Sequence, residues 1–454
     1  MLEPENFETA VKHKVWVQAM EEEIKMIEKN NTWELTDRPK DKEVIGVKWI
    51  YKTKLNADGS IQKHKARLVA KGYSQLPGID YTETFAPVAR LDTIRALIAI
   101  AANKKWKIYQ MDVKSAFLNG YIDEEIYVEQ PQGFIAKGSE EKETMRKMIQ
   151  VFKEDMMKTF EMSDLGLMHF FLGIEINQEK EGIFICQRKY TETLLKKFKM
   201  ESCKTVTTPL VTGEKYQKED GSQKVDGSMY RSLIGSLLYL TATRPDIMFA
   251  TCLLSRFMQS PSQVHYAAAK RILRYLRGTK DFGIWYKSTN DAKLVGYTDS
   301  DWAGSVDDMK STSGYTFSLG SGIFSWASKK QATVAQSSAE AEYIAAAATS
   351  NQAIWLRRIL EDIGEKQEEP TTIYCDNKSA IAITKNPVQH SRTKHIDIKY
   401  HSLREATTRG EIELKYCSTE EQLADIFTKA LPRNKFEELR MKIGVYHKHI
   451  KGEY

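Results

Sequence analysis

The sequence is poor in cysteine, and its five cysteines form no pattern that is typical of a disulfide framework or a zinc site. They are odd in number, lie far apart and include no Cys-X-X-Cys pair, so we expect an intracellular, cytoplasmic or nuclear protein. The first residues, Met1-Leu2-Glu3-Pro4-Glu5, lack the basic and apolar regions of a signal peptide. The longest apolar run, around 96–102, is too short to span a bilayer, so we expect no membrane partner.

An excess of charge of one sign is also missing. The net charge of +6 permits a polyanionic partner without requiring one. Hydrophobic residues at 41% and charged residues at 28% are ordinary for globular proteins. At 454 residues the chain should contain two or three domains. We expect no small-molecule cofactor, and the sequence does not indicate an oligomeric state.

The N-terminal part begins with an amphipathic pattern over 6–31 that predicts a helix. A strand over 46–51, the turn Asn56-Ala57-Asp58-Gly59 and a strand over 61–73 then predict a hairpin. Alternation places three basic residues of the second strand on one face, where they either contact a nucleic-acid backbone or only blunt an edge strand. These residues are Lys63, Lys65 and Arg67.

The middle of the chain is predicted to be largely helical. A buried helix over 91–102 precedes a strand over 106–113, in which Asp112 is either a metal ligand or a helix cap. The polar stretch 205–228 indicates a linker, and three helices follow it, the third over 261–277. One face of that third helix either tracks a phosphate backbone or is simply solvated, and the second alternative is slightly favoured. Its basic residues are Lys270, Arg274 and Arg277.

The C-terminal part has a regular order of elements: three strands, a helix, a strand, two helices, a strand and a last helix. The strands are expected at 294–298, 314–319, 323–328, 371–375 and 411–416, and the helices at 337–363, 376–383, 396–406 and from Ser418. Capping boxes mark the starts of the first and last helices, Ser337-Ser338-Ala339-Glu340 and Ser418-Thr419-Glu420-Glu421. This order is that of the ribonuclease H fold.

Four carboxylates occur at positions in this order where they can meet. Asp299 follows the first strand, Glu342 lies on the long helix, Asp376 ends another strand, and Asp425 is expected two turns into the last helix. Carboxylate oxygens are the ligands that Mg²⁺ prefers, and two ions roughly 3.5–4 Å apart can hydrolyse a phosphodiester. We therefore predict a two-metal site for Mg²⁺ or Mn²⁺, with Asp299 as the bridging ligand.

Each of these assignments has an alternative. Asp301 competes with Asp299, and Glu340 competes with Glu342. Asp376 could only cap its helix, and Asp425 could be an ordinary exposed helix residue. The pair Asp307-Asp308 is interpreted as solvated turn residues of the first hairpin loop.

Two series of short motifs resemble the Pol polyproteins of copia-type retrotransposons. The first is similar to their reverse transcriptase: KARLVAKG at 65–72, TFAPV at 84–88, QMDVKSAFLNG at 110–120, QPQGF at 130–134, FEMSDLG at 160–166 and FLGIE at 171–175. The second is similar to their ribonuclease H domain: YTDSDWAG at 297–304, SAEAEY at 338–343, CDNKSA at 375–380, KHID at 394–397 and LADIFTK at 423–429. The second series covers essentially that whole domain.

The resemblance implies a polymerase site that is incomplete. It would make Asp112 a metal ligand, Phe117 the residue that screens the incoming sugar, and Arg67 a triphosphate contact. The family's Leu-Tyr-Gly-Leu-Lys-Gln segment and Tyr-Val-Asp-Asp turn should lie between 134 and 160, where only a short charged segment, 138–143, is present. Because one carboxylate cannot hold two ions, we expect no DNA polymerase activity.

The resemblance implies that the second site is intact and cuts RNA in RNA–DNA hybrids. Asp299, Glu342, Asp376 and Asp425 would be its catalytic and metal-binding residues. Relatives of this fold often carry a histidine in the loop before the last helix, but here that loop, 416–419, has none. His395 and His401 are either structural or touch substrate. The alternative is a non-catalytic nucleic-acid-binding chain, or an inert remnant.

The expected fold class is α+β or α/β, with a truncated fingers and palm-like region, a helical connection, and a ribonuclease H-like mixed sheet with flanking helices. The expected division is a reverse-transcriptase-like remnant over 1–204 with a junction near 135–150, a linker over 205–228, a thumb or connection-like region over 229–290, a ribonuclease H-like domain over 291–433 and a tail over 434–454.

Overall fold

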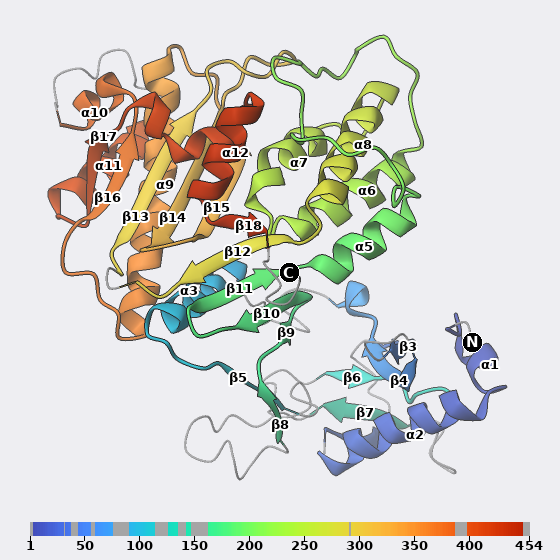
Figure 1. Cartoon of the computed structure of the whole chain (residues 1–454). Helices are drawn as coiled ribbons and strands as arrows, with labels where there is room; N and C mark the ends of the chain where they lie inside the picture. The colour runs from blue at the N-terminus through green and yellow to red at the C-terminus, as the bar shows by residue number, and fades with distance from the viewer. Residues whose placement is uncertain are drawn as a thin grey trace. The chain divides into compact units, whose positions relative to one another are not determined.

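The computed structural model describes most of the chain, as two compact units (Figure 1). The described residues are 3–30, 32–37, 44–55, 60–75, 90–113, 126–134, 142–146, 162–289, 292–385 and 397–447. Unit 1 contains 1–88 and 110–166, and unit 2 contains 89–109 and 167–454. This division differs from the expected boundaries, because residues 89–109 belong with the C-terminal part of the chain.

Unit 1 is built on a helix that packs against a hairpin. The expected helix over 6–31 is two helices, α1 (Phe7–Ala10) and α2 (Lys14–Lys29). The hairpin consists of β3 (Val47–Leu55) and β4 (Ile61–Ala70), in antiparallel register. A small core of Trp16, Met20, Tyr51 and Ala66 joins α2 to the hairpin.

Short strands complete unit 1. A four-stranded sheet has the order β1-β7-β6-β2, and β5 pairs with β8. Their bounds are β1 (Trp33–Asp37), β2 (Val44–Ile45), β5 (Tyr109–Val113), β6 (Tyr127–Val128), β7 (Lys142–Arg146) and β8 (Met162–Leu167).

In unit 2, one antiparallel sheet joins segments that are far apart in the sequence. Its order is β18-β12-β11-β10-β9. Helix α3 (Leu91–Asn103) lies beside β11 and β12, and its blue ribbon stands among elements of much later colour in Figure 1. The strands are β9 (Phe170–Phe171), β10 (Ile174–Gln178), β11 (Gly182–Cys186), β12 (Phe282–Lys287) and β18 (Val445–His447).

A buried arginine fixes α3 in this unit. The Arg95 side chain donates from Nε to the Phe324 carbonyl at 2.7 Å and from Nη1 to the Ala242 carbonyl at 2.9 Å. Its guanidinium lies 3.6 Å from the centroid of the Trp326 ring. Every donor direction of a buried guanidinium must be satisfied, so these contacts specify the position of α3.

Helices form a layer beside this sheet. They are α5 (Arg188–Lys197), α6 (Gly227–Leu240), the 3₁₀ turn η3 (Pro245–Ile247), α7 (Met248–Ser255) and α8 (Gln263–Gly278). The predicted linker 205–228 forms almost no regular structure, but Leu210 and Tyr216 are buried in the core of unit 2. This segment is therefore a packed part of the unit rather than a free connection.

The second sheet of unit 2 has the order β15-β14-β13-β16-β17. Strands β13 (Leu294–Ser300), β14 (Thr312–Leu319) and β15 (Ile323–Lys330) are antiparallel, whereas β13, β16 (Thr371–Cys375) and β17 (Ile412–Tyr416) are parallel. Parallel strands end at the same edge of a sheet, so the residues after β13 and β16 lie close together. This topology is that of the ribonuclease H-like fold, as predicted.

Helices flank this sheet. They are α9 (Ser338–Asp362), α10 (Lys378–Lys385), α11 (Asp397–Thr408) and α12 (Arg433–Lys442), together with the 3₁₀ segments η6 (Thr419–Glu421) and η7 (Leu423–Phe427). Two expectations are wrong here. No helix starts at Ser418, because two 3₁₀ segments precede α12, and 434–447 is not a tail, because it contains most of α12 and all of β18. Among the described helices, none is both long and apolar enough to cross a membrane.

Candidate metal centre

Asp299 lies near the end of β13 and is buried, with 2% of its surface exposed. The Thr428 hydroxyl donates a hydrogen bond to its carboxylate. Segment η7 approaches this strand closely, because Gln422 Nε2 donates to the Thr298 carbonyl at 2.9 Å. The neighbouring position on β14 is Gly314, where a Cβ would lie 2.7 Å from Phe427 Cβ, so only glycine leaves room for η7.

Glu342 faces Asp299 from the first turns of α9. The Ser337 side chain caps this helix by accepting a hydrogen bond from the Glu340 amide. The Glu340 carboxylate in turn accepts from the Gln336 amide at 2.9 Å, so it is used at the helix start. Glu342 Oε1 instead accepts from the Ser300 amide at 3.3 Å, next to Asp299. Of the two candidate glutamates, Glu342 therefore lies with the other carboxylates, whereas Glu340 does not.

Asp376 follows β16 and does not cap the next helix. The Asn377 side chain takes that role by accepting from the Ala380 amide at 3.0 Å. Asp376 accepts a hydrogen bond from the Thr419 hydroxyl at 3.1 Å. The hydrogen bond from η6 therefore holds the Asp376 carboxylate near the end of β13.

Asp425 lies in η7, not two turns into an α-helix. Pro432 precedes the true last helix, α12, and the 3₁₀ segment before it is capped by Gln422, which accepts from the Ala424 amide. Asp425 has 3% of its surface exposed, so it is not an ordinary exposed residue. Lys429 Nζ lies 2.8 Å from Asp425 and 3.8 Å from Asp299.

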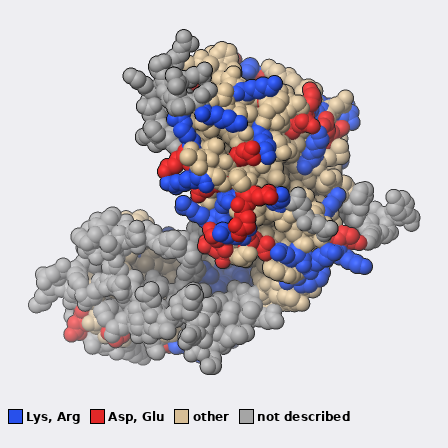
Figure 2. All heavy atoms as spheres, turned by 90° about the vertical axis from the view of Figure 1, so that its left-hand side faces the viewer, with Lys and Arg blue, Asp and Glu red and all other residues tan. Residues whose placement is uncertain are grey.

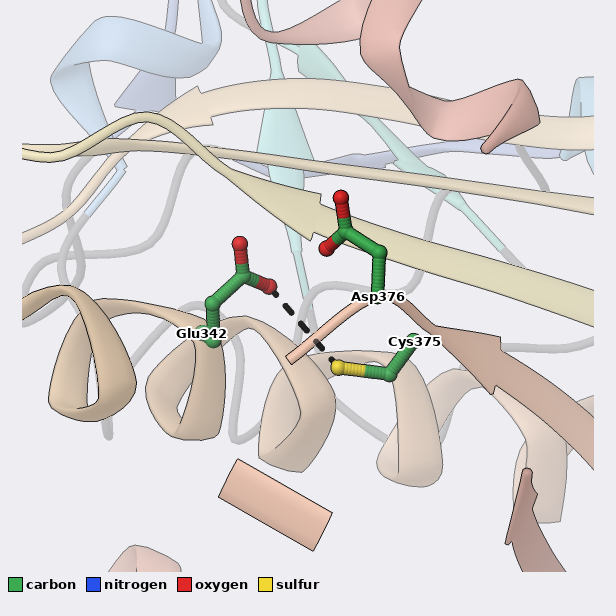
Figure 3. A group of neighbouring side chains, drawn as sticks. All are labelled: Glu342, Cys375 and Asp376. Atoms are coloured by element: carbon green, nitrogen blue, oxygen red, sulfur yellow. Dashed lines mark hydrogen bonds between the residues drawn. The ribbon is translucent and has the colours of Figure 1, made fainter. Parts of the chain in front are cut away.

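The four carboxylates converge as two overlapping groups. Asp299, Asp376 and Asp425 each offer an oxygen within 4.8 Å of the others, and so do the ligand atoms of Glu342, Cys375 and Asp376. Figure 3 shows the second group, with Glu342 on α9 opposite the two residues at the end of β16. Asp376 is common to both groups, and the role of Asp299 as the bridging ligand stays a prediction.

Electrostatic repulsion is concentrated in this cluster. Burial, followed by the charges of Asp299 and Asp376, raises the pKa of Glu342 well above its usual range. Burial and the charge of Asp299 also raise the pKa of Asp376, and they raise that of Asp425 to about 7. Although burial lowers the pKa of Lys429, the charges of Asp299 and Asp425 raise it overall. A cluster of this kind favours a cation.

These shifts predict that the stability of the metal-free protein depends on pH. Carboxyls with raised pKa values bind protons more tightly in the folded protein, so their stabilising contribution is lost as the pH rises through those values, up to about 7 for Asp425. Mg²⁺ should then raise the melting temperature by at least about 4 °C more at about pH 8 than at about pH 5. Thermal melting with and without Mg²⁺ measures this, and an equal increase at both pH values would contradict it.

Other acidic candidates lie outside the two groups. The Asp301 carboxylate accepts a hydrogen bond from the Thr312 amide, and burial raises its pKa to about 6. Asp307 accepts from the Lys218 amide at 2.9 Å, and Asp308 forms an ion pair with Lys330 at 2.7 Å. The last two are turn residues held by protein partners.

The predicted nucleic-acid contacts remain predictions. Lys65 and Arg67 on β4 lie near the half-buried Glu23 of α2. Burial raises the pKa of Glu23, and the charges of Lys65 and Arg67 lower it by a smaller amount. On α8, Arg277 Nε donates to the Glu201 carbonyl at 2.7 Å, so part of this basic face is used within the protein. Figure 2 shows basic and acidic side chains interspersed over the described part of the drawn face of unit 2.

Several predicted residues lie outside the described part of the chain. Phe117 and His395 are among them, and only the backbones of Asp112 and His401 are described, on β5 and α11. Conversely, sequence reasoning missed Thr428 and Lys429, which contact the carboxylates directly. The opposite charges of Asp425 and Lys429, four residues apart, are a signal that could have identified the lysine.

Comparison with known proteins places this arrangement in a family. A sequence model described as "Reverse transcriptase (RNA-dependent DNA polymerase)" matches the chain in two parts, 30–146 and 143–212. The "Retrovirus-related Pol polyprotein from transposon RE2" of Arabidopsis thaliana is 37% identical over 506 residues, which cover 98% of this chain and 35% of that protein. The corresponding polyprotein from transposon TNT 1-94 of Nicotiana tabacum is 36% identical and covers 98% and 39%.

Solved structures with some similarity were also found. The foamy viral protease-reverse transcriptase in complex with dsDNA is 12% identical and covers 90% of this chain and 84% of its own, with a TM-score of 0.45. An N-terminal RNase H domain from Mycobacterium tuberculosis is 12% identical and covers 33% and 97%, with a TM-score of 0.24.

The family match and the topology of the second sheet define a reverse transcriptase-related chain that contains a ribonuclease H-like domain. The chain belongs to the copia-type retrotransposon Pol polyprotein family. It spans about a third of the length of the curated Pol polyproteins that it matches.

Proposed function

We propose that the ribonuclease H-like domain hydrolyses the RNA strand of RNA–DNA hybrids in a reaction that depends on Mg²⁺ or Mn²⁺. The observation that carries this proposal is the convergence of Asp299, Glu342, Asp376 and Asp425 from four separate elements. Four buried or half-buried carboxylates cost free energy when they lie together without a cation. Such an arrangement is typical of a metal centre rather than of a structural core.

The donor set fits a hard divalent ion. Asp299, Asp376 and Asp425 would hold one ion through oxygen atoms, and Glu342 with Asp376 would hold a second. Bound ions would supply an activated water and would stabilise the charge on the leaving oxygen. The thiol of Cys375 lies 4.0 Å from Glu342 and is deeply buried, and burial raises its pKa, so it remains protonated near neutral pH.

The surrounding residues keep these ligands in place. The Thr428 hydroxyl and the Ser300 amide donate to Asp299 and Glu342 respectively, which fixes the directions of their remaining lone pairs. Lys429 offsets part of the negative charge and lies at the exposed side of the cluster, with 41% of its side chain exposed. It is therefore placed where a substrate phosphate would approach.

The direct test is cleavage of a hybrid whose RNA strand carries a label. We expect the purified chain to cut the RNA and leave a 3′-hydroxyl in the presence of Mg²⁺, and to leave the DNA strand intact. Removal of the ion with a chelator should stop the reaction. Binding of the hybrid without cleavage would favour the non-catalytic alternative, and the absence of binding would favour an inert remnant.

We further propose that polymerase activity is lost. Two observations support this: the two parts of the family match meet at 143–146, and the alignment with RE2 runs over 506 positions although the chain has 454 residues. The relative therefore contains residues that this chain lacks. The sequence has one Asp-Asp pair, Asp307-Asp308, and it lies between β13 and β14.

A primer-extension assay tests this loss. We expect no templated synthesis above the background of the assay, because Asp112 has no carboxylate pair with which to hold two ions. The same preparation should be assayed for hybrid cleavage, so that an unfolded sample is recognised. Synthesis that depends on the template and is abolished by Asp112→Asn would overturn the proposal.

A further inference from the structure

A cavity of about 520 Å³ lies beside the metal centre in unit 2. It is lined by the segment 213–218, by α7, by the β13–β14 loop and by residues 428–430. Small-ligand pockets occupy roughly 300–1,000 Å³, so this cavity can hold a group of the size of one nucleotide. We call it the side cavity.

The wall formed by 213–218 is held in place by several contacts. Tyr216 is buried, and its hydroxyl donates to Glu214 at 2.8 Å. The Lys218 amide donates to Asp307 at 2.9 Å, which ties this wall to the neighbouring β13–β14 loop. His265 Nε2 lies 3.1 Å from the Gln217 carbonyl. The side cavity is therefore preorganised, not a gap beside a mobile linker.

The lining combines positive charge with aromatic surface. Lys215 and Lys218 are exposed along one wall, and Arg256 lies at the other, where it donates to the Thr312 hydroxyl at 2.8 Å. The Trp302 side chain is 58% exposed, although its indole N–H is directed to the Ala335 carbonyl at 3.4 Å. An exposed aromatic ring beside basic side chains is the combination that binds single-stranded nucleic acid.

The acidic residues of the lining are already engaged. Glu214 accepts from Tyr216, Asp307 accepts from the Lys218 amide, and Asp301 accepts from the Thr312 amide. Each carboxylate keeps its negative charge, but the lining carries five basic side chains against these three acidic ones.

The side cavity adjoins the metal centre through two shared residues. Thr428 and Lys429 line it, and the same two residues contact Asp299 and Asp425. An occupant of the side cavity would thus be adjacent to any phosphodiester held at the carboxylates. A base-paired nucleotide could enter the side cavity only together with the nucleotide it pairs with. A cavity of this volume therefore suits a single unpaired nucleotide.

We propose that the side cavity binds an unpaired nucleotide of the RNA strand that enters the metal centre, with its phosphate near Lys215, Lys218 and Arg256 and its base against Trp302. The proposal rests on the proposed nuclease function for the identity of the strand. It predicts that a hybrid with a single-stranded RNA extension binds more tightly than the blunt hybrid.

Binding is measured by fluorescence anisotropy with the full chain carrying Asp299→Asn, so that the substrate is not cut. Stacking of a base on an aromatic ring contributes to the free energy of binding. Trp302→Ala should therefore weaken binding of the extended hybrid about 5-fold or more. Binding of the blunt hybrid should not change. Trp302→Phe should restore most of the affinity, because it keeps an aromatic face.

Trp106→Ala is the matched control, because Trp106 is also 58% exposed but lies outside the side cavity. Equal effects of the two tryptophan substitutions, or equal losses for blunt and extended hybrids, would overturn the proposal. The proposal would also be overturned if Trp302→Ala weakened binding without changing the melting curve and Trp302→Phe weakened it equally.

The lysines provide a second measurement. Lys215→Gln with Lys218→Gln should reduce the salt dependence of binding to the extended hybrid by about 0.7 in logarithmic slope for each lysine. Lys196→Gln with Lys204→Gln is the control pair, at exposed positions outside the lining. An unchanged slope in the first pair would contradict the phosphate assignment.

The two proposals can fail separately. If the wild-type chain cuts no hybrid but prefers the extended one in a Trp302-dependent way, the side cavity is a binding site and the nuclease proposal is wrong. If it cuts hybrids and Trp302→Ala leaves the preference unchanged, the nuclease proposal holds and the side-cavity proposal is wrong.

Discussion

Replacing Asp299 with asparagine is expected to reduce Mg²⁺-dependent hydrolysis of the hybrid by about 10³-fold, because one negatively charged ligand of the metal centre is lost. Asparagine keeps the shape of the side chain and can still accept the hydrogen bond from Thr428. The folded structure should therefore persist while the chemistry fails. Initial rates with a labelled hybrid, measured at saturating Mg²⁺, give the effect.

The same substitution should stabilise the metal-free protein. The charge of Asp299 raises the pKa values of Glu342, Asp376 and Asp425, so its removal relieves repulsion among the three remaining carboxylates. We expect a higher melting temperature than that of the wild type in a chelator at about pH 8. This combination of lost activity and gained stability distinguishes a metal ligand from a structural residue.

Glu340→Gln is the matched control for Asp299→Asn. Glu340 is a buried carboxylate of the same region, but it accepts a hydrogen bond from the Gln336 amide at the start of α9. A glutamine side chain can still accept this hydrogen bond. Its activity should stay within about threefold of the wild type, as expected for a loss of less than about 1 kcal/mol. Wild-type activity in Asp299→Asn, or an equal loss in both variants, would show that the metal centre is assigned wrongly.

The ribonuclease H-like sheet was largely predictable because its signals are local. Strand β16 has the predicted bounds, and α9 begins beside the predicted cap at Ser337. Periodicity and capping depend on neighbours within a few residues, so the sequence carries them directly. Three of the four carboxylates lie at the ends or starts of such elements, and their convergence followed from the element order.

The surroundings of Asp425 were not predictable in the same way. The capping box at Ser418 favours a helix, but Gln422 bonds to the Thr298 carbonyl and η7 packs onto Gly314, and these contacts join residues more than a hundred positions apart. The pairing of β18 with β12 and the burial of α3 in unit 2 are non-local for the same reason. Tertiary contacts override local preference there.

The second large effect concerns a buried ion pair in the helical layer of unit 2. Arg244 and Asp246 form two hydrogen bonds of 2.9 and 2.7 Å, and both side chains are almost fully buried. The Tyr275 hydroxyl donates to Asp246 at 2.6 Å, and Arg440 of α12 lies 3.1 Å from the same hydroxyl. The network therefore joins η3, α8 and α12.

Asp246→Asn should destabilise the folded protein by about 3–5 kcal/mol, because it leaves the guanidinium of Arg244 buried without a counter-charge. Tyr275→Phe removes one hydrogen bond and should cost only about 1–3 kcal/mol. Urea denaturation, followed by circular dichroism, measures both values. The order of the two effects is the critical result, since a purely steric role would make the larger change at Tyr275 the more costly one.

Arg433→Met is the matched control, because it removes one partner of an exposed pair on α12. Arg433 lies 3.0 Å from Glu437, but its side chain is 64% exposed, so water solvates the remaining charge. Its effect should stay below about 1 kcal/mol.

Because α12 also leads into β18, loss of the buried network should release the C-terminal strand from β12. Faster amide exchange at Val445 in Asp246→Asn than in Arg433→Met would show this, and equal exchange in the two variants would confine the damage to η3 and α8.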